Sequence, residues 1–368
     1  MPLDFEADAP LAPRTTFRVG GPARFYAEAG SVDEIAAAHA WARDRSMPCF
    51  VLGGGSNLVV ADRGLDALVL RVRVRGVVHR EDGDLTLVHA GAGEPWDDLV
   101  ARVTADGLAG LECLSGIPGD VGATPIQNVG AYGCEVGELI ESVDLWRRGD
   151  GMSETRAAAD CGFGYRHSVF KGAERDRFVV TGVTFRLRRG VVPTARYGEL
   201  ASFVAARGVS TLAGMRDAVL ELRREKSMVL DPSDPNHRCA GSFFMNPIVD
   251  ADEAPRVRQR AIAIGALDPS ASMPAYPAGP GKVKLAAGWL IERSGFARGT
   301  TRERVGLSTK HALAIVNLGD ARATDVVSFA REIRDGVRER LGVRIVPEPE
   351  LVGFTDDELG DLVDARAV

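Results

Sequence analysis

A glycine-rich stretch between residues 116 and 133 decides the fold of this chain. It reads Gly116-Ile117-Pro118-Gly119-Asp120-Val121-Gly122-Ala123-Thr124-Pro125-Ile126-Gln127-Asn128-Val129-Gly130-Ala131-Tyr132-Gly133. Five of these 18 residues are glycine and two are proline. Glycine can turn where other residues clash, and without a Cβ its backbone can approach a ligand closely. The stretch therefore indicates a backbone cradle for a ligand.

Apolar side chains alternate with these glycine and proline residues, and they can fix the loop to a core. They are Ile117, Val121, Ile126 and Val129. A flexible linker is the alternative interpretation, but linkers lack apolar residues at such regular places. We therefore predict an ordered loop.

A second glycine-rich loop, Gly53-Gly54-Gly55-Ser56-Asn57, lies between two strand-like segments, Phe50–Leu52 and Leu58–Val60. A Rossmann dinucleotide loop instead joins a strand to a helix and has the spacing G-x-G-x-x-G. The consecutive glycines and the strand that follows them disfavour a Rossmann fold. The N–H groups of a tight Gly/Ser loop can still bind an anion without a helix dipole. We expect both loops to hold one phosphate-bearing ligand.

The bulk composition is that of an ordinary globular protein. The 368 residues suffice for two or three domains, with 45% hydrophobic and 26% charged residues. A net charge of -6 does not favour nucleic acid or anionic membranes as partners. The five widely spaced cysteines form no metal-binding or disulfide pattern, so reduced thiols in the cytoplasm fit best. We expect neither a signal peptide nor a membrane span.

Hydrophobic patterning and turn residues predict an α+β chain. Thr16–Ala29 is expected to form strand and turn, with Gly20-Gly21-Pro22 at its bend. Further strands are expected at Phe50–Leu52, Leu58–Val60, Leu68–Val78, Leu85–His89, Ser142–Arg148, Phe178–Leu187, Ala312–Asn317 and Arg344–Val346. Helices are expected at Ile35–Arg45, Pro95–Thr104, Ala201–Arg207, Leu212–Lys226, Asp252–Ile264, Val283–Arg293 and Asp325–Leu341. Ser31-Val32-Asp33-Glu34 matches a capping box at the start of the first helix. The pattern changes near residue 191, which predicts a domain boundary there.

Three short segments contain side chains that could carry chemistry. They are Tyr165-Arg166-His167-Ser168, Gly241-Ser242-Phe243-Phe244-Met245-Asn246-Pro247 and Glu348-Pro349-Glu350. Each alone has an ordinary structural explanation as an ion pair, a turn or an exposed carboxylate. Ser242 is not in a G-x-S-x-G motif and has no neighbouring His/Asp pair, which excludes a serine hydrolase. No cluster of metal ligands is visible, so the residues alone indicate a metal-free enzyme with a phosphate-bearing ligand.

Six motifs in order resemble the UDP-N-acetylenolpyruvoylglucosamine reductases, bacterial enzymes that make UDP-N-acetylmuramate for peptidoglycan. The resemblance covers nearly the whole chain, from about Thr16 to Phe354. Its motifs are Gly53-Gly54-Gly55-Ser56-Asn57-Leu58, the stretch Ser115–Gly133, Tyr165-Arg166-His167-Ser168-Val169-Phe170-Lys171, Gly241-Ser242-Phe243-Phe244-Met245-Asn246-Pro247, Lys284-Leu285-Ala286-Ala287-Gly288-Trp289-Leu290-Ile291 and Glu348-Pro349-Glu350.

The resemblance implies a vanillyl-alcohol-oxidase-like (PCMH-type) fold in which two α+β lobes bind FAD non-covalently. The FAD-binding domain is expected at residues 14–190, with lobes at about 1–67 and 68–190, and the substrate-binding domain at 191–347. Residues 348–368 are expected to return to the FAD-binding region. The expected FAD-binding residues are Gly53, Gly54, Gly55, Ser56, Asn57, Leu58, Ser115, Gly116, Ile117, Pro118, Gly119, Gly122, Ala123, Asn128 and Gly130.

The resemblance also implies the reaction and the residues that serve it. NADPH reduces the flavin, flavin N5 then delivers hydride to C3 of UDP-N-acetylglucosamine enolpyruvate, and Ser242 protonates C2. Arg166 and Glu350 are implied to stabilise the enolate of the substrate carboxylate, with Glu350 protonated or sharing a proton. Tyr197 matches the tyrosine loop of one subclass, in which the ring closes on the sugar nucleotide.

Two further residues are implied near the substrate, and one position departs from the family pattern. Lys226 and Asn246 align with positions near the substrate phosphates and carboxylate, although a solvated lysine is the ordinary interpretation of a helix position such as 226. His311 stands where some relatives have glutamine before Ala312-Leu313, which leaves that substrate contact open.

Two other functions remain as alternatives. An oxidase of the same fold would act on an alcohol or sugar lactone and pass electrons rapidly to oxygen, often from a covalently linked flavin. The Ser56 loop offers no histidine for such a link, and Ser242 has no evident task in an oxidase. A nucleotide-sugar-binding regulator would show no turnover, with flavin absent or unreactive.

Overall fold

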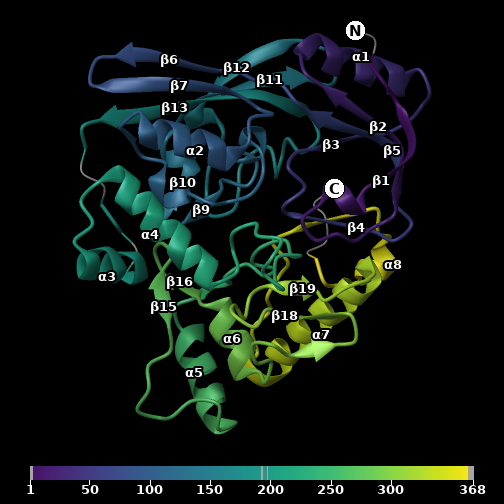
Figure 1. Ribbon diagram of the computed structural model, residues 1–368. Coiled ribbons are helices and arrows are strands. Elements are labelled where there is room, and N and C mark those ends of the chain that lie inside the picture. Colours follow the sequence, from purple (N-terminus) through teal and green to yellow (C-terminus); the bar gives the residue numbers. More distant parts are fainter. Residues whose placement is uncertain (1–2, 192–193, 197, 364–368) are drawn as a thin grey trace. The chain divides into compact units, whose positions relative to one another are not determined.

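A computed structural model of the chain describes residues 3–191, 194–196 and 198–363. These residues form two compact units. The first unit takes in the described residues of Met1–Ala9, Ala23–Gly55 and Asp66–Leu230; the second takes in those of Pro10–Pro22, Ser56–Leu65 and Asp231–Val368. Helices and sheets occur in both, as the α+β prediction requires (Figure 1).

The first unit contains two main sheets. The smaller has the order β1-β2-β5-β3, and the larger has the order β12-β11-β13-β7-β6, with β8 paired to β13. Its strands are β1 (Glu6–Pro10), β2 (Pro22–Ala29), β3 (Cys49–Leu52), β5 (Leu65–Val72), β6 (Val77–Asp82), β7 (Leu85–Gly91), β8 (Leu108–Ala109), β11 (Ile140–Arg147), β12 (Ser153–Ala157) and β13 (Phe178–Arg189). A hairpin of β9 (Gly130–Ala131) and β10 (Cys134–Glu135) adds to them.

Among the described residues, four helices complete the first unit: α1 (Val32–Arg43), α2 (Trp96–Ala105), α3 (Gly198–Arg207) and α4 (Leu212–Glu225). The predicted capping box at α1 is confirmed only in its first half, because Ser31 Oγ, at the N-cap, accepts a hydrogen bond from Glu34 N. The Glu34 carboxylate accepts from Gly30 N instead of the N–H of Ser31 itself. Helix α2 covers one face of the larger sheet, where the Trp96 ring lies 5.8 Å from that of Phe185 (Figure 1). The buried α2 and sheet residues belong to one hydrophobic core.

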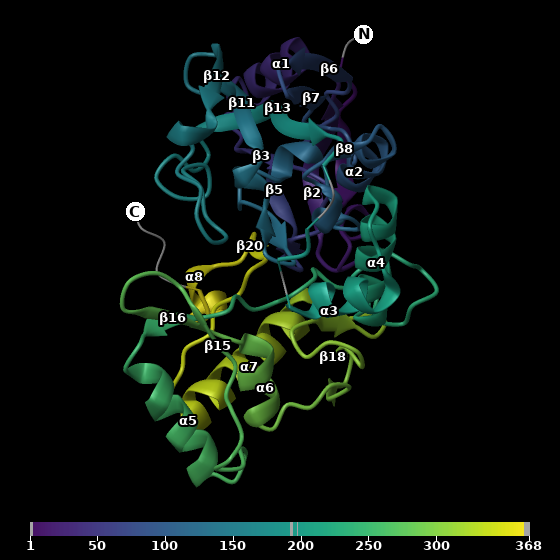
Figure 2. The same ribbon diagram turned by 90° about the vertical axis from the view of Figure 1, so that its left-hand side faces the viewer.

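The second unit combines small sheets with four helices. Its sheets have the orders β14-β16-β15, β17-β18-β19 and β20-β4. Their strands are β4 (Leu58–Val60), β14 (Ile248–Asp250), β15 (Ala275–Pro277), β16 (Lys282–Leu285), β17 (Thr301–Arg302), β18 (Val305–Leu307), β19 (Ile315–Asn317) and β20 (Glu350–Val352). The helices are α5 (Glu253–Ala263), α6 (Ala287–Arg293), α7 (Ala323–Leu341) and α8 (Asp356–Leu359), of which α5, α6 and α7 lie together (Figure 2).

Short 3-10 turns connect several of these elements. They lie at Ala12–Arg14, Glu112–Leu114, Val121–Ala123, Val136–Glu138 and Ala158–Asp160. Among the described residues, no helix is both long and apolar enough to cross a lipid bilayer.

Residues 56–65 belong to the second unit because two of its elements hold them. Strand β4 pairs in parallel with β20, with Leu58 opposite Glu350. The Asp62 carboxylate accepts hydrogen bonds from Ala323 N at 2.7 Å and Thr324 N at 3.1 Å. A carboxylate that accepts the unpaired N–H groups at a helix start stabilises that helix. Asp62 thus caps α7 from a point far away in the sequence.

Three predicted elements were wrong in part. Leu68–Val78 is not one strand, since β5 ends at Val72 and β6 begins at Val77. The predicted helix at Val283–Arg293 is strand β16 followed by helix α6, because Lys282–Leu285 pairs with its neighbours in the sheet. The predicted strand Arg344–Val346 lies outside any strand of the described residues. The boundary near residue 191 stays a prediction, and the two units part between Leu230 and Asp231.

Candidate active site

The loop at residues 53–55 contacts the glycine-rich cradle through bare backbone. A methyl group on Gly54 would lie 2.4 Å from Gly119 Cα, so only glycine allows the two backbone segments to come this close. A methyl group on Gly53 would lie 3.5 Å from the Ala123 Cβ, which is an ordinary contact. Gly55 has φ +66°, in the left-handed region that favours glycine.

Most of the cradle is anchored to the first unit. Val121 is fully buried, and Ile117 and Val129 pack against the same core, as predicted. The expectation that Ile126 pins the loop was wrong, because this side chain is 37% exposed. The Ser115 hydroxyl donates to Glu112 O at 2.7 Å, and Gly122 N donates to Ala92 O at 2.8 Å. The cradle is therefore an ordered loop and not a linker.

An ion pair neutralises the one acidic residue within the cradle. Arg71 Nη2 donates to Asp120 Oδ2 at 2.9 Å, and both side chains are largely buried. Burial raises the pKa of Asp120, although Arg71 and Arg73 act against the shift. Because Arg71 compensates the charge of the Asp120 carboxylate, this carboxylate does not leave an unpaired negative charge in a loop suited to anions. Sequence analysis missed Arg71, which stands 49 positions before its partner.

These loops fit a phosphate-bearing cofactor such as FAD. Gly53, Gly54 and the segment Ile117–Gly119 stay partly exposed while the residues beside them are buried. Accessible N–H groups in side-chain-free turns make concavities for anions. Gly53, Gly54, Gly55 and the cradle would hold the FAD pyrophosphate, and the expected Ser56, Asn57 and Leu58 belong to the second unit.

The cradle also holds the turn that presents Arg166. Gly164 and His167 exchange two backbone hydrogen bonds, which leaves Tyr165 and Arg166 at the tip of a tight turn. The buried Asn128 donates from Nδ2 to Gly164 O at 2.9 Å, and Arg166 Nη2 donates to Gly130 O at 2.9 Å. Asn128 and Gly130 were predicted to bind FAD, and in the structure both contact the Arg166 turn.

Ser242 lies in a segment of the second unit that backbone hydrogen bonds of the next residue, Phe243, hold in place. Phe243 N donates to Leu313 O at 2.7 Å, and Phe243 O accepts from Glu348 N at 2.8 Å. The Phe243 and Phe244 rings on its C-terminal side are fully buried, while Ser242 is half-buried. Gly241 before it has φ +73°. The serine hydroxyl is thus presented from a fixed backbone.

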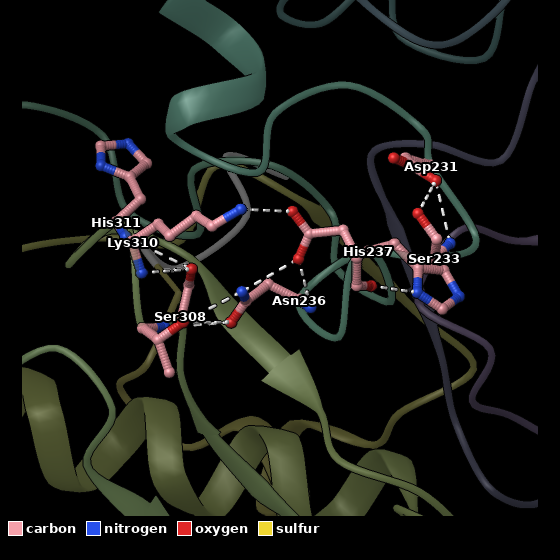
Figure 3. A network of polar contacts seen from close by, with 9 residues as sticks. Asp231, Ser233, Asn236, His237, Ser308, Lys310 and His311 are labelled. Carbon is pink, nitrogen blue, oxygen red and sulfur yellow. Dashed lines mark hydrogen bonds and ion pairs between the residues drawn. The ribbon is translucent and has the colours of Figure 1, made fainter.

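A polar network fixes the loop that leads to Ser242 (Figure 3). Asn236, 4% exposed, donates from Nδ2 to Thr309 Oγ1 at 3.1 Å and accepts from Thr309 N at 3.0 Å. Asp234 pairs with Lys310 Nζ at 3.0 Å. His311 follows Lys310 in the loop that contains Thr309, and its N–H donates to Ser308 Oγ at 3.3 Å. No local pattern could have predicted this network, because its partners are about 70 residues apart.

Glu350 begins strand β20. Its N–H donates to Asn57 O at 3.0 Å, and Asn57 Nδ2 donates to Glu348 O at 3.3 Å. The expected FAD loop residue Asn57 therefore also positions the Glu350 strand. Ser242 and Glu350 belong to the second unit and Arg166 to the first.

The three expected substrate-binding residues have different surroundings. Lys226 caps the C-terminal end of α4, forms an ion pair with Glu199 of α3 and lies 5.8 Å from the centroid of the Tyr132 ring. Asn246 Oδ1 accepts from Ala287 N at 2.9 Å, at the start of α6. Tyr197 lies outside the described residues. Within the described residues, no group of His, Cys, Asp and Glu side chains could hold a metal ion.

Comparison with known proteins defines the class of protein and then the family. Residues 23–155 match the family model of an FAD-binding domain, and residues 232–352 match that of the C-terminal domain of UDP-N-acetylenolpyruvoylglucosamine reductase. With its glycine-rich loops, the chain is an FAD-binding oxidoreductase with the predicted α+β, PCMH-type fold. More particularly, it belongs to the UDP-N-acetylenolpyruvoylglucosamine reductase family.

Similarity to individual members extends over nearly the whole chain. The enzyme of that name from Thermobifida fusca is 47% identical over 359 residues, which cover 96% of this chain and 100% of the relative. That from Nocardia farcinica is 50% identical, covering 93% of this chain and 88% of the relative. The crystal structure of the enzyme from Thermus caldophilus matches with a TM-score of 0.62 at 26% identity, covering 95% and 98% of the two chains.

Proposed function

We propose that this chain reduces UDP-N-acetylglucosamine enolpyruvate to UDP-N-acetylmuramate with electrons from NADPH, in the cytoplasm, as a step of peptidoglycan precursor synthesis. The observation that carries the proposal is family membership over 96% of the chain. All six motifs, which include the expected catalytic and FAD-binding residues, lie within that span. The partners are then small molecules, with no nucleic acid and no membrane insertion.

When bound non-covalently in the glycine-rich loops, FAD supplies a hydride relay between NADPH and C3 of the enolpyruvyl group. Ser242 donates the proton that C2 needs once C3 has gained hydride. A hydroxyl is a weak acid, so this transfer requires close positioning and a strongly basic carbon. The hydrogen bonds of the Phe243 N–H and carbonyl oxygen, next to Ser242, supply that positioning.

Arg166 meets the negative charge that develops on the substrate carboxylate. A guanidinium stays charged at all relevant pH values, and its planar shape matches a carboxylate. Glu350 shares this task, as a protonated group or through a shared proton, because an ionised carboxylate would repel the enolate. Lys226 and Asn246 hold the substrate phosphates and carboxylate, and Tyr197 closes over the sugar nucleotide. Residues 191–347 contribute the substrate-binding domain, and the segment 348–368 returns to the FAD-binding region. The pairing of Glu350 with Leu58, in β4, supports this return.

Two half-reactions under anaerobic conditions test this function. NADPH is expected to bleach the visible flavin absorbance of the purified protein, and the enolpyruvyl sugar nucleotide is then expected to restore it with formation of UDP-N-acetylmuramate. Rapid return of absorbance with oxygen, but none with the sugar nucleotide, would indicate an oxidase instead. A protein that takes up no flavin, or a flavin that NADPH cannot reduce, would indicate a regulator without turnover.

A further inference from the structure

The Asp97 carboxylate connects two parts of the first unit that the proposed function uses separately. Asp97 lies in the first turn of α2, and its Oδ1 accepts a hydrogen bond from Gly116 N in the cradle at 2.6 Å. Arg216 of α4 donates to both carboxylate oxygens, from Nη1 at 2.6 Å and from Nη2 at 2.8 Å. A forked arginine–carboxylate pair fixes geometry as well as adding energy.

The surroundings keep this pair charged and in place. The Arg216 side chain is 15% exposed and that of Asp97 is 36% exposed. Burial alone would raise the pKa of Asp97, but the Arg216 guanidinium and the Gly116 N–H hold it below its ordinary value. The Asp97 carboxylate is therefore ionised at neutral pH, when it accepts all three hydrogen bonds.

Gly116 also contacts α4 directly. It has φ +72°, and a methyl group there would lie 2.8 Å from Leu220 Cδ2 of α4. Only glycine combines this backbone conformation with so close an approach. One end of the cradle thus packs against α4, the same helix to which Asp97 is bound through its ion pair with Arg216.

The other end of the cradle contacts the C-terminal end of α4. Lys226 follows the last residue of this helix, and its ammonium lies 5.8 Å from the ring centroid of Tyr132, a cradle residue. The buried side chains of α3 and α4 form a small core against which Tyr132 packs. A shift of α4 along its axis would therefore move Lys226 and disturb both ends of the cradle.

We propose that Asp97 is a positioning residue that couples the binding of FAD to the binding of the sugar nucleotide. Asp97 holds Gly116 and Arg216 in one arrangement, so that a cradle shaped for FAD sets α4 in the position that presents Lys226 to the substrate. This inference rests on the proposed function, which assigns FAD to the cradle and substrate to Lys226. Because coupling between two sites is reciprocal, the sugar nucleotide must tighten FAD binding by the same factor.

The test measures the dissociation constant of FAD from the apoprotein by flavin fluorescence, with and without saturating UDP-N-acetylglucosamine enolpyruvate. In the wild type, the sugar nucleotide is expected to tighten FAD binding by roughly 5- to 150-fold, the usual range for coupled sites. In Asp97→Asn, this factor is expected to fall to about one. A merely structural role would weaken FAD binding equally with and without the sugar nucleotide and leave the factor unchanged.

Two further variants keep the test decisive. Arg216→Lys retains the charge but loses the fork, so it is expected to lower the factor even if Asp97→Asn fails to fold. Glu221→Gln is the matched control, because it removes the ion pair of α4 with Arg207, at 2.8 Å, on an exposed face of the helix. Its coupling factor is expected to equal that of the wild type.

The outcomes separate the two proposals. In one outcome, the sugar nucleotide perturbs the flavin spectrum of the wild type, but the coupling factor is unchanged in both Asp97→Asn and Arg216→Lys. This outcome overturns the role of Asp97. The same holds for a wild-type factor of one despite a clear spectral perturbation. A wild type whose flavin spectrum does not respond to the sugar nucleotide at all overturns the proposed function instead.

Discussion

Arg166 donates a hydrogen bond from Nη2 to the carbonyl oxygen of Gly130 at 2.9 Å, while its own backbone has φ 54°. The left-handed region costs an ordinary residue about 1–2 kcal/mol, and such strain persists only where the surroundings enforce it. Here the two backbone bonds between Gly164 and His167 and the Gly130 carbonyl enforce it. The turn thus holds the guanidinium in one place, as the proposed role of Arg166 at the substrate carboxylate requires.

The first prediction compares Arg166→Gly with Arg166→Ala. Glycine adopts the left-handed conformation without penalty, so Arg166→Gly is expected to be more stable than Arg166→Ala by about 1 kcal/mol. Both variants should lose on the order of 10²-fold or more in kcat, as when one donor to a developing anion is removed. Urea unfolding and steady-state kinetics check the two parts. Equal stability of the two variants would contradict the strain argument.

The second prediction concerns the contact between the two glycine-rich loops. In Gly54→Ala the new methyl group would lie 2.4 Å from Gly119 Cα, and a backbone atom cannot give way as a side chain can. The apoprotein is expected to lose about 1–3 kcal/mol of unfolding free energy, as other overpacked sites do. Gly53→Ala is the matched control, since its methyl group meets the Ala123 Cβ at 3.5 Å. Denaturant unfolding of both apoproteins measures the difference, and equal losses would contradict the contact.

Local sequence signals predicted the elements whose cause is local. The N-cap residue Ser31, whose Oγ accepts from Glu34 N, begins α1 as the sequence pattern predicted. At Lys282–Leu285 the neighbours in space decided the conformation against the local pattern, and the prediction was wrong. Lys282–Leu285 has residues compatible with a helix, but its partners Ile248–Asp250 and Ala275–Pro277 make it the central strand of a sheet.

The candidate site was inferred from motifs and not from geometry. The motifs indicated Arg166, Ser242 and Glu350 as candidates, but no spacing rule could indicate the long-range contacts of the cradle and of the Glu348–Glu350 segment. Asp97 and Arg216 are 119 residues apart in the sequence, and Asn57 lies 291 residues before Glu348. Each of these partners has an ordinary sequence context, so only the fold brings them together.

The third prediction concerns Ser242→Ala, in which the backbone bonds of Phe243 remain and only the hydroxyl is lost. Flavin reduction by NADPH is expected to keep its rate, because this step needs no proton from Ser242. Reoxidation by the enolpyruvyl substrate should slow by about 10²- to 10⁴-fold, the usual contribution of a general acid. Rapid-mixing absorbance under anaerobic conditions measures both steps in one protein, so the first serves as the control for the second. Normal reoxidation would remove Ser242 from the acid role.

The fourth prediction concerns the dependence of stability on pH. Protonation of one histidine of the first unit, His89, is expected to stabilise the folded state, and protonation of another, His39, to destabilise it. A hydrogen bond from His89 Nε2 to Asp144 Oδ2 at 2.9 Å raises the pKa of His89 above its ordinary 6.5. The same bond lowers the pKa of Asp144. Burial lowers the pKa of His39 to about 4, with a contribution from Arg148.

The His89–Asp144 pair stabilises the folded state fully below pH 6.5, and this stabilisation is lost as pH rises through the raised pKa of His89. The pair is partly exposed, so His89→Gln should cost about 0.2–1 kcal/mol at mildly acidic pH and less at alkaline pH. His39→Gln should show the reverse, with its relative stability rising as pH falls from 6.5 towards 4, because it removes the penalty of protonating a buried ring. Urea unfolding of the wild type and both variants across this pH range measures the effect, and parallel curves for the two variants would contradict it.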